Sequence, residues 1–379
     1  MDIEKLLQFM VERGASDLFI TAGVAPSVKL NGRVSPVTKS PLSPEQSKEI
    51  VLGVMNDEQK AEFKLHKECN FAIATRGQGR FRVSAFQQRN MVGMVARRIE
   101  THIPTLEDLN LPTQLKDLSM TKRGLIIFVG ATGTGKSTSL AAMIGHRNRY
   151  SKGHIITIED PIEFIHQHAG CIVTQREVGV DTESFDVALR NTLRQAPDVI
   201  MLGEVRSRET MDYALAFAET GHLALCTLHA NNANQALDRI INFFPSDRHE
   251  QVWMDMSLNM RAIVAQQLIP TSDGHGRRAA IEIMINTPLV ADTIRKGDVH
   301  LIKEMMTKGT EAGMQTFDQA LYNLYASGDI DYEVAISHAD SPNDLRLMIK
   351  MGVDANKGSL GSIAGNLSLE ETDESNMMR

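Results

Sequence analysis

One short segment constrains the fold of this chain more than any other. Residues 130–137 read Gly-Ala-Thr-Gly-Thr-Gly-Lys-Ser, which satisfies the pattern Gly-x-x-x-x-Gly-Lys-Ser/Thr. An apolar stretch over 125–129 precedes the segment, and a helical pattern over 137–149 follows it. A glycine-rich turn between a buried strand and a helix lets backbone N–H groups converge on an anion. The sequence therefore predicts an α/β fold with a phosphate-binding loop.

The residues of this loop have expected roles in binding a nucleoside triphosphate. Backbone N–H groups and the helix N-terminus face the phosphates, Lys136 reaches the β- and γ-phosphates, and the Ser137 hydroxyl binds Mg²⁺. We expect the nucleotide contacts to come from Gly130, Ala131, Thr132, Gly133, Thr134, Gly135, Lys136, Ser137 and Thr138.

Strand and helix patterns alternate beyond this loop. Such alternation favours a mostly parallel sheet with helices on its faces. After residue 286 the pattern changes to several short helices, which end near residue 350. Strands are expected at 125–129, 154–158, 171–175, 198–202 and 223–227, and helices at 137–149, 184–195, 207–219 and 232–241.

The first hundred residues predict a separate α+β unit. Apolar residues at helical spacing indicate a helix over 2–12, and Ser43 with Gln46 is typical of a capping box before a second helix. Asn31-Gly32 between alternating residues predicts a hairpin over 28–34. Further strands are expected at 17–21, 70–75, 80–87 and 91–97, with a turn at 77–79.

These patterns divide the chain into five parts. Pro104 and Pro112 bracket a short helical piece and indicate a linker. The last residues have no aromatic side chain and many Gly, Ser, Asn and acidic residues, so we expect them to be disordered. The expected parts are an N-terminal domain over 1–100, a linker over 101–113, a nucleotide-binding core over 114–290, helices over 291–351 and a tail over 352–379.

Composition excludes several classes of protein. The 379 residues include 47 acidic and 40 basic side chains, a net charge of −7, which disfavours a protein whose whole surface binds nucleic acid. No apolar run approaches the roughly 20 residues of a membrane-spanning helix, and the acids near the N-terminus disfavour a signal peptide. The cysteines, Cys69, Cys171 and Cys226, are far apart, so we expect inert thiols in a reducing cytosol.

A carboxylate lies at each end of the predicted strand 198–202. A phosphate-loop site needs an acid at the end of a nearby strand to hold the metal ion through water. Glu204 has this position, so Ser137 and Glu204 are the predicted Mg²⁺ residues. Asp198 lies at the opposite end of the strand and is expected to be structural.

Three further carboxylates, those of Glu159, Asp160 and Glu163, follow the predicted strand 154–158. A catalytic base that polarises the attacking water is expected among them. Their spacing alone does not choose one of the three.

Histidines and arginines complete the candidate site. His222 precedes the strand 223–227 and His229 follows it, and an imidazole there can donate a hydrogen bond to a γ-phosphate. Arg80 and Arg82 lie two residues apart, hence on one face of a strand. They are interpreted either as arginine fingers directed at the nucleotide of a neighbouring subunit, or as a solvated basic face or a nucleic-acid-binding stripe.

Four of these segments follow the order in which a known superfamily carries its motifs. They are the loop 130–137, Glu159-Asp160-Pro161-Ile162-Glu163, Gly203-Glu204-Val205-Arg206, and Thr220-Gly221-His222 with Thr227-Leu228-His229. They resemble the Walker A, Asp, Walker B and His boxes of the secretion-type AAA-like ATPases. Over residues 1–345 the chain is more closely similar to the type IV pilus retraction ATPases of the PilT/PilU group, and the ending 339–347 with its long tail resembles the PilU members.

This resemblance implies a fold, an activity and site roles. It implies a PAS-like α+β domain, a RecA-like P-loop NTPase domain with C-terminal helices, and a hexameric ring that binds ATP and Mg²⁺ and hydrolyses ATP. It makes Glu163 the catalytic base and Glu204 the Walker B acid, and it makes His229, within a box that also contains His222, a phosphate contact. It further implies that Arg80, Arg82 or Arg97 approaches the nucleotide.

The resemblance also implies partners and a location. A motor of this kind acts at the cytoplasmic face of the inner membrane on a pilus platform protein, peripheral to the membrane and without direct contact to nucleic acid. The stretch 290–297 differs from the corresponding helix of the retraction motors, which favours action together with a paralogous retraction ATPase. Ser207 also stands where relatives usually have Asp.

Three alternatives remain open from the sequence. One is a nucleotide-binding adaptor ring that acts mainly through protein contacts. Another is a GTPase, although Asn356-Lys357 is followed by Gly-Ser rather than completing a guanine-selecting motif. The third is a nucleic-acid motor. An assembly ATPase is disfavoured, because the paired CxxC motifs of those relatives are absent.

Overall fold

A computed structural model describes residues 2–30, 32–75 and 79–352. The backbone divides into two compact units, the first built from residues 1–105 and 141–204 and the second from residues 106–140 and 205 onward. The predicted hairpin residue Asn31, part of the predicted turn at 77–79 and the predicted tail beyond Gly352 lie outside the described residues. The five predicted parts of the chain stay a prediction.

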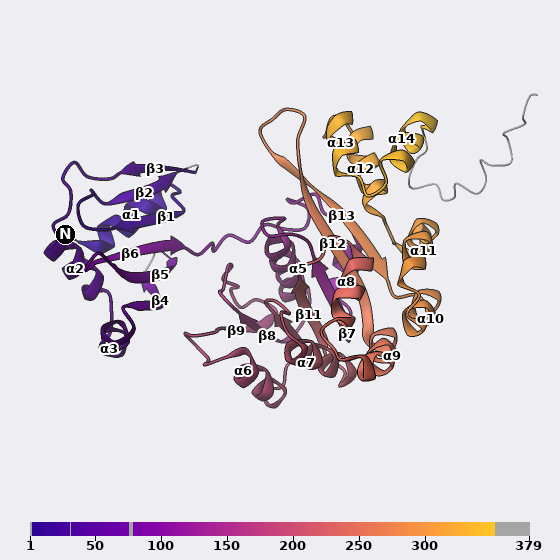
Figure 1. The fold of residues 1–379 in the computed structure, drawn as a ribbon, viewed down its shortest axis with the longest axis horizontal. Coiled ribbons are helices and arrows are strands. Elements are labelled where there is room, and N and C mark those ends of the chain that lie inside the picture. Colours follow the sequence, from indigo (N-terminus) through magenta and orange to yellow (C-terminus); the bar gives the residue numbers. More distant parts are fainter. Residues whose placement is uncertain (1, 31, 76–78, 353–379) are drawn as a thin grey trace, which may run out of the picture. The chain divides into compact units, whose positions relative to one another are not determined.

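The N-terminal part of the first unit is a six-stranded sheet (Figure 1). Its strand order is β3-β2-β1-β6-β5-β4, and every pairing is antiparallel. The expected strands and the expected hairpin are confirmed. The strands are β1 (Asp17–Ile20), β2 (Ser27–Leu30), β3 (Arg33–Pro36), β4 (Glu68–Thr75), β5 (Gly79–Gln88) and β6 (Met91–Arg98).

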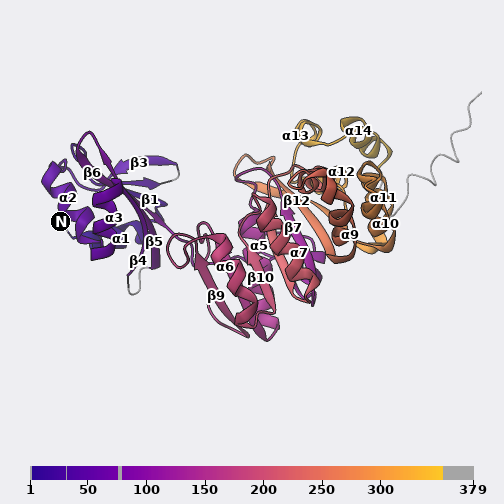
Figure 2. The same ribbon diagram turned by 60° about the horizontal axis from the view of Figure 1, so that its bottom comes forward.

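Helices α1 (Ile3–Glu12), α2 (Pro44–Gly53) and α3 (Asp57–His66) pack on this sheet (Figure 2). Leu7 and Met10 of α1 and Val51 of α2 are buried in one core with the strands. The predicted capping box is confirmed, because Ser43 and Gln46 each accept the other's backbone N–H. This part of the chain is therefore held by its own apolar core.

The rest of the first unit contains three parallel strands in the order β10-β8-β9. They are β8 (Gly153–Glu159), β9 (Cys171–Glu177) and β10 (Val199–Leu202). Helix α6 (Phe185–Thr192) continues into a 3-10 turn, Leu193–Gln195. Together they cover nearly all of the helix predicted over 184–195. The strand ends that precede Asp160 and Gly203 share one edge, because parallel strands run in the same direction.

The second unit contains four strands in the order β13-β12-β7-β11. Parallel pairing joins β7 to β11 and to β12, and antiparallel pairing joins β12 to β13. The hairpin of β12 and β13 was not expected from the sequence. The strands are β7 (Gly124–Val129), β11 (Leu223–Leu228), β12 (Met260–Pro270) and β13 (Arg277–Ile285).

Helices follow the expected alternation and then dominate the C-terminal region. α5 begins in the second unit and continues into the first. The helices are α4 (Gln114–Ser119), α5 (Lys136–Tyr150), α7 (Arg208–Glu219), α8 (Ala233–Ile241), α9 (His249–Asn259), α10 (Pro288–Lys296), α11 (Ile302–Lys308), α12 (Phe317–Ala326), α13 (Tyr332–His338) and α14 (Pro342–Met351), with 3-10 turns at Ser246–Arg248, Val299–Leu301 and Thr310–Ala312.

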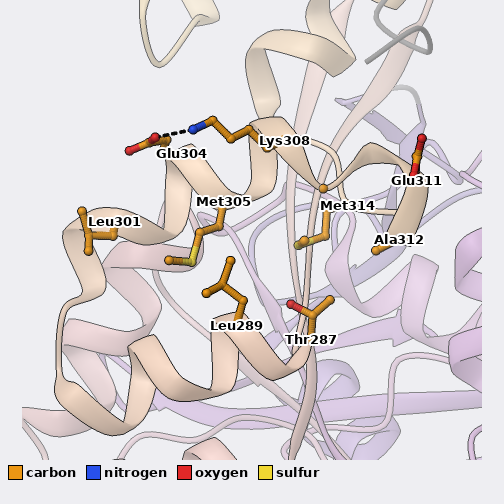
Figure 3. A pocket seen from close by; sticks show the side chains of 10 residues that line it. Thr287, Leu289, Leu301, Glu304, Met305, Lys308, Glu311, Ala312 and Met314 are labelled. Atoms are coloured by element: carbon orange, nitrogen blue, oxygen red, sulfur yellow. Dashed lines mark hydrogen bonds and ion pairs between the residues drawn. The ribbon is translucent and has the colours of Figure 1, made fainter. Parts of the chain in front are cut away.

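Helices α10 and α11 border a cavity of about 450 Å³ (Figure 3). Leu289 of α10 and Met305 of α11 point into it, and an ion pair between Glu304 and Lys308 lies at its rim. Within the described residues, no helix has the length and apolar character that crossing a bilayer requires.

Candidate functional site

The phosphate-loop motif joins β7 to α5 in the second unit. All six residues of β7 are buried, and Gly130 follows at its carboxyl end. Gly130, Gly133 and Gly135 have φ angles of 154°, 79° and 85°. A Cβ atom on Gly130 would lie 2.6 Å from the backbone oxygen of Gln266, whereas one on Gly133 would meet nothing within 4 Å. Glycine is therefore required at the first position by close approach and at the second by backbone conformation.

Lys136 lies against the loop from which it emerges. Its ammonium donates hydrogen bonds to the carbonyl oxygens of Gly130 (2.7 Å) and Ala131 (2.8 Å). The side chain is 8 % exposed. Because an ammonium is a compact charge on a flexible stem, it can exchange these carbonyl oxygens for phosphate oxygens without a change in the fold.

A cavity of about 200 Å³ adjoins the loop. Gly135, Thr138 and Ser139 line one side of it, and residues 108–111 and 277–279 line the other. Gln266 of β12 also lines this cavity, and its side chain accepts a hydrogen bond from Ser139 Oγ at 2.8 Å. The second unit thus combines a phosphate-loop motif with a neighbouring cavity.

The two candidate histidines lie at opposite ends of β11. In the register with β7, Leu228 pairs with Val129 and Leu223 pairs with Gly124. His229 therefore follows the strand at the edge where the phosphate loop begins. His222 lies at the other edge, where its backbone oxygen accepts from Gly124 N and its ring contacts Thr220 Oγ1 at 3.1 Å. Six residues of strand, about 20 Å, separate the two histidines, so His222 lies away from the phosphate loop.

The carboxylates after β8 have different environments. Glu159 is buried, and its Oε1 accepts from Thr157 Oγ1 (2.6 Å) and Gln175 Nε2 (3.2 Å). Burial raises the pKa of Glu159 to about 7, against the effect of these hydrogen bonds and of one from the Glu163 backbone N–H. Asp160 and Glu163 are exposed. Of the three acids, two are therefore open to solvent while Glu159 is held inside.

Glu204 follows β10 at the same edge as Glu159. Gly203 precedes it and donates its N–H to the Ile158 oxygen at 2.7 Å. A Cβ atom on Gly203 would lie 3.2 Å from the Glu159 Cα, so the chain crosses the end of β8 closely. At the far end of β10, Asp198 Oδ2 accepts from His154 N (2.8 Å), which confirms the predicted structural role of Asp198.

Arg80 and Arg82 of β5 face acids of their own unit. The Arg80 guanidinium lies 3.9 Å from Asp181 Oδ2, and Asp181 in turn accepts from Glu177 N at 2.9 Å. Burial raises the pKa of Glu177, while the Ile162 N–H, Arg82 and Arg80 act in the opposite direction. These contacts place the two arginines beside Glu177, the last residue of β9, and Asp181 in the turn after it. Their contact with a nucleotide stays a prediction.

Arg97 has a different partner. Its Nε donates to Asp17 Oδ1 at 2.7 Å between neighbouring strands β6 and β1. Burial alone would raise the pKa of Asp17, but hydrogen bonds from Arg97 and Ser16 hold it below its usual value. This pair lies within the N-terminal sheet, and the expected approach of Arg97 to a nucleotide is likewise untested.

The predicted Mg²⁺ residues, Ser137 and Glu204, carry the kinds of oxygen atom that this ion binds. Mg²⁺ in nucleotide sites usually binds phosphates, waters and one or two protein oxygens. The hydroxyl of Ser137, in the first turn of α5, and the carboxylate of Glu204 are suitable donors. Within the described part of the chain, no group of three or more His, Cys, Asp or Glu side chains is arranged to hold a metal ion.

Sequence reasoning missed several contributors to these surroundings. Gln266 accepts a hydrogen bond from Ser139 beside the phosphate loop, and Gln175 donates one to the buried Glu159. Glu177 and Asp181 interact with the two arginines of β5. No local pattern marks the glutamines. The acids could have been suggested by their place directly after the predicted strand 171–175. The three cysteines are buried and free, as expected.

Comparisons with known proteins agree with this arrangement. The family described as "Type II/IV secretion system protein" matches residues 1–326. The type IV pilus ATPase PilU of Pseudomonas aeruginosa is 72 % identical over 374 residues, 99 % of this chain and 98 % of that protein. PilT of the same organism, described as a type IV pilus retraction ATPase, is 41 % identical over 344 residues, 91 % of this chain and 100 % of PilT.

A solved structure shares the fold. The crystal structure of the pilus retraction motor PilT with bound ADP superposes with a TM-score of 0.86 at 39 % identity, and it covers 92 % of this chain and 100 % of that one. Sequence and fold agree over nearly the whole length. The chain therefore belongs to the type II/IV secretion system protein family and, within it, to the type IV pilus ATPases of the PilT/PilU group.

Proposed function

We propose that this chain is a Mg²⁺-dependent ATPase whose hydrolysis of ATP powers type IV pilus retraction and twitching motility. The observation that carries the proposal is the phosphate loop, in which glycines with positive φ curve the backbone at the carboxyl end of β7 and Lys136 is held at the loop. The neighbouring cavity of about 200 Å³ offers room for the part of the nucleotide beyond its phosphates.

In this proposal the loop N–H groups and the N-terminus of α5 bind the β- and γ-phosphates, as anions bind at helix N-termini. Lys136 leaves the carbonyls of Gly130 and Ala131 to contact phosphate oxygens. Ser137 and Glu204 hold Mg²⁺, which neutralises the charge that develops during in-line attack by water.

Other roles follow from the motifs. Glu163 is the proposed general base, and its exposure suits a group that must meet water. His229 is the proposed contact to the γ-phosphate. Arg80 and Arg82 are proposed to approach the nucleotide, which requires them to exchange their contacts with Asp181 and Glu177.

We further propose a hexameric ring at the cytoplasmic face of the inner membrane, acting with a paralogous retraction ATPase on a platform protein. Similarity to both PilU and PilT of one organism supports a paralogous pair. The divergent sequence of α10 supports a role that depends on the second ATPase.

Steady-state phosphate release tests this proposal. The purified chain is assayed with Mg²⁺ and ATP, alone and with the paralogous ATPase. Lys136→Ala is expected to lower the rate at least about 100-fold, because it removes the charge that binds the transferred phosphate. Lys152→Ala, at an exposed lysine just after α5, is the matched control and should retain the rate. The chain alone, and the chain with the paralogous ATPase, should each release phosphate faster than the same sample made with Lys136→Ala. If neither does, the motor proposal fails and an adaptor ring remains.

A further inference from the structure

A buried carboxylate in β13 faces the N-termini of two helices. Glu282 is 2 % exposed. Its Oε1 accepts the backbone N–H of Ala233, the first residue of α8, at 2.8 Å. The backbone N–H of Phe317, the first residue of α12, also lies near enough to this carboxylate to lower its pKa. First-turn N–H groups have no partner within their own helix, so Glu282 satisfies the start of α8 and interacts favourably with the start of α12.

The backbone explains why α12 begins beside β13. Ile283 and Gln315 form an antiparallel bridge, with N–H to oxygen distances of 2.8 and 3.0 Å. The Gln315 side chain adds a hydrogen bond to the Ile281 oxygen at 2.9 Å. This short pairing brings the start of α12 to the level of Glu282.

A second buried carboxylate continues the connection to two more helices. Asp318 of α12 is 4 % exposed and accepts the backbone N–H groups of Asp340 (2.9 Å) and Ser341 (3.2 Å), where α14 begins. Lys303 of α11 pairs with Asp318 at 3.4 Å and with Asp340 at 3.3 Å. Asp318 and Lys303 thus join α12 to α14 and α11.

The connection begins at the loop that carries His229. Asn232 is the N-cap of α8 and accepts from Gln235 N at 3.0 Å. Its side-chain amide also donates to Asp340 Oδ2 at 3.5 Å. The segment 229–232 therefore ends in a residue that is fixed by the same group of side chains.

We propose that Glu282 is a positioning residue for ATP hydrolysis, which holds the His229 segment in place and couples it, through Asp318 and Lys303, to the C-terminal helices α11, α12 and α14. This inference rests on the proposed contact between His229 and the γ-phosphate.

The physical reason for the coupling is the cost of leaving the Ala233 N–H without its buried acceptor. A buried donor that loses its acceptor bears its full desolvation cost, so the start of α8 moves with Glu282. The pairing of Ile283 with Gln315 carries the start of α12 with the same strand. A displacement of the His229 segment on phosphate release is then transmitted to α12, and through Asp318 and Lys303 to α11. The adjacent residues Glu304 and Met305 of α11 line the cavity against α10 (Figure 3).

The test measures kcat and KM for ATP with the full chain and with variants. Glu282→Gln keeps the shape but places an amide NH₂ against an N–H donor. It is expected to lower kcat about tenfold (about 1.4 kcal/mol), with KM within about twofold, since the phosphate loop is intact.

Two lysines of α11 provide a matched pair. Lys303→Met is expected to lower kcat, whereas Lys308→Met, which loses only the exposed pair with Glu304, should leave it unchanged. If Glu282→Gln does not fold, this pair alone decides. Equal kcat in both lysine variants would overturn the inference.

Hydrogen exchange supplies a readout that a purely structural role would not move. With a non-hydrolysable ATP analogue, the wild-type segments 229–235 and 315–320 should gain protection together. In Glu282→Gln only the first should respond. A wild-type chain in which 315–320 ignores the nucleotide overturns the coupling. A wild-type chain without Lys136-dependent hydrolysis contradicts the proposed function instead.

Discussion

The phosphate loop and the group formed by Glu282, Asp318 and Lys303 solve the same physical problem in opposite ways. Each gathers backbone N–H groups at helix N-termini, where an anion is stabilised. The loop leaves that position open to a phosphate from solution. The C-terminal group fills it with buried carboxylates of the chain, which accept from Ala233, Asp340 and Ser341. One kind of site can therefore serve either for binding a ligand or for joining helices.

The largest expected effect separates two glycines of the loop. A methyl group on Gly130 would lie 2.6 Å from a backbone oxygen, so Gly130→Ala must displace the loop. We expect ATP affinity to fall about a thousandfold, the equivalent of losing about two hydrogen bonds to a charged group. Binding of a fluorescent ATP analogue measures this.

Gly133→Ala is the matched control for that change. Its Cβ atom would meet nothing within 4 Å, so only the backbone strain of a positive φ remains. That strain is about 1 kcal/mol, so a loss of less than about tenfold is expected. Equal losses in both variants would show that conformation, rather than contact with Gln266, determines the loop.

The second prediction concerns pH and tests the buried carboxylate. Burial raises the pKa of Glu282 to about 7 from the ordinary 4.5, despite its two N–H donors and Lys303. The folded carboxyl therefore holds its proton more tightly than the unfolded one. This protonation stabilises the fold fully below pH 4.5, and the stabilisation is lost as pH rises through 7. Relative to Glu282→Gln, the wild-type chain should therefore lose about 3 kcal/mol of unfolding free energy across this range.

Urea titrations at pH 5 and pH 8 measure this difference. Glu159 has a similarly raised pKa and remains in the variant, so part of the wild-type slope persists. Glu304→Gln, at an exposed acid of α11, should keep the full wild-type slope. A slope in Glu282→Gln equal to that of the wild type would show that Glu282 is ionised in the fold throughout the range.

The same comparison explains how much the sequence could predict. The phosphate loop is contiguous, and the strands around it alternate with helices at regular spacing. Its context was therefore predicted, as were the N-terminal strands and the helices after residue 286. The hairpin of β12 and β13 was missed, although it carries both Gln266 and Glu282.

The side-chain contacts of the C-terminal group were beyond sequence reasoning. Glu282 and Ala233 are 49 residues apart, and Asp318 and Asp340 are 22 apart. A lone Glu in a strand and an Asp in a first turn have many possible partners, and only the tertiary fold selects one. The same reason applies to His222, whose place at the opposite edge from the loop depends on strand register.

The smallest expected effect compares the junction of the two regions with a helix elsewhere. Asn232 caps α8 through Gln235 N (3.0 Å), and Asn56 caps α3 through Gln59 N (2.8 Å). Replacing either by Ala should cost about 1 kcal/mol of stability, because each removes one N-cap. Thermal unfolding should show a similar decrease in melting temperature for the two variants. Only Asn232→Ala should also lower kcat, because α8 follows the His229 segment whereas α3 packs on the N-terminal sheet. If both variants lose stability and neither loses rate, the α8 cap contributes to folding alone and the coupling must enter through Glu282 without it.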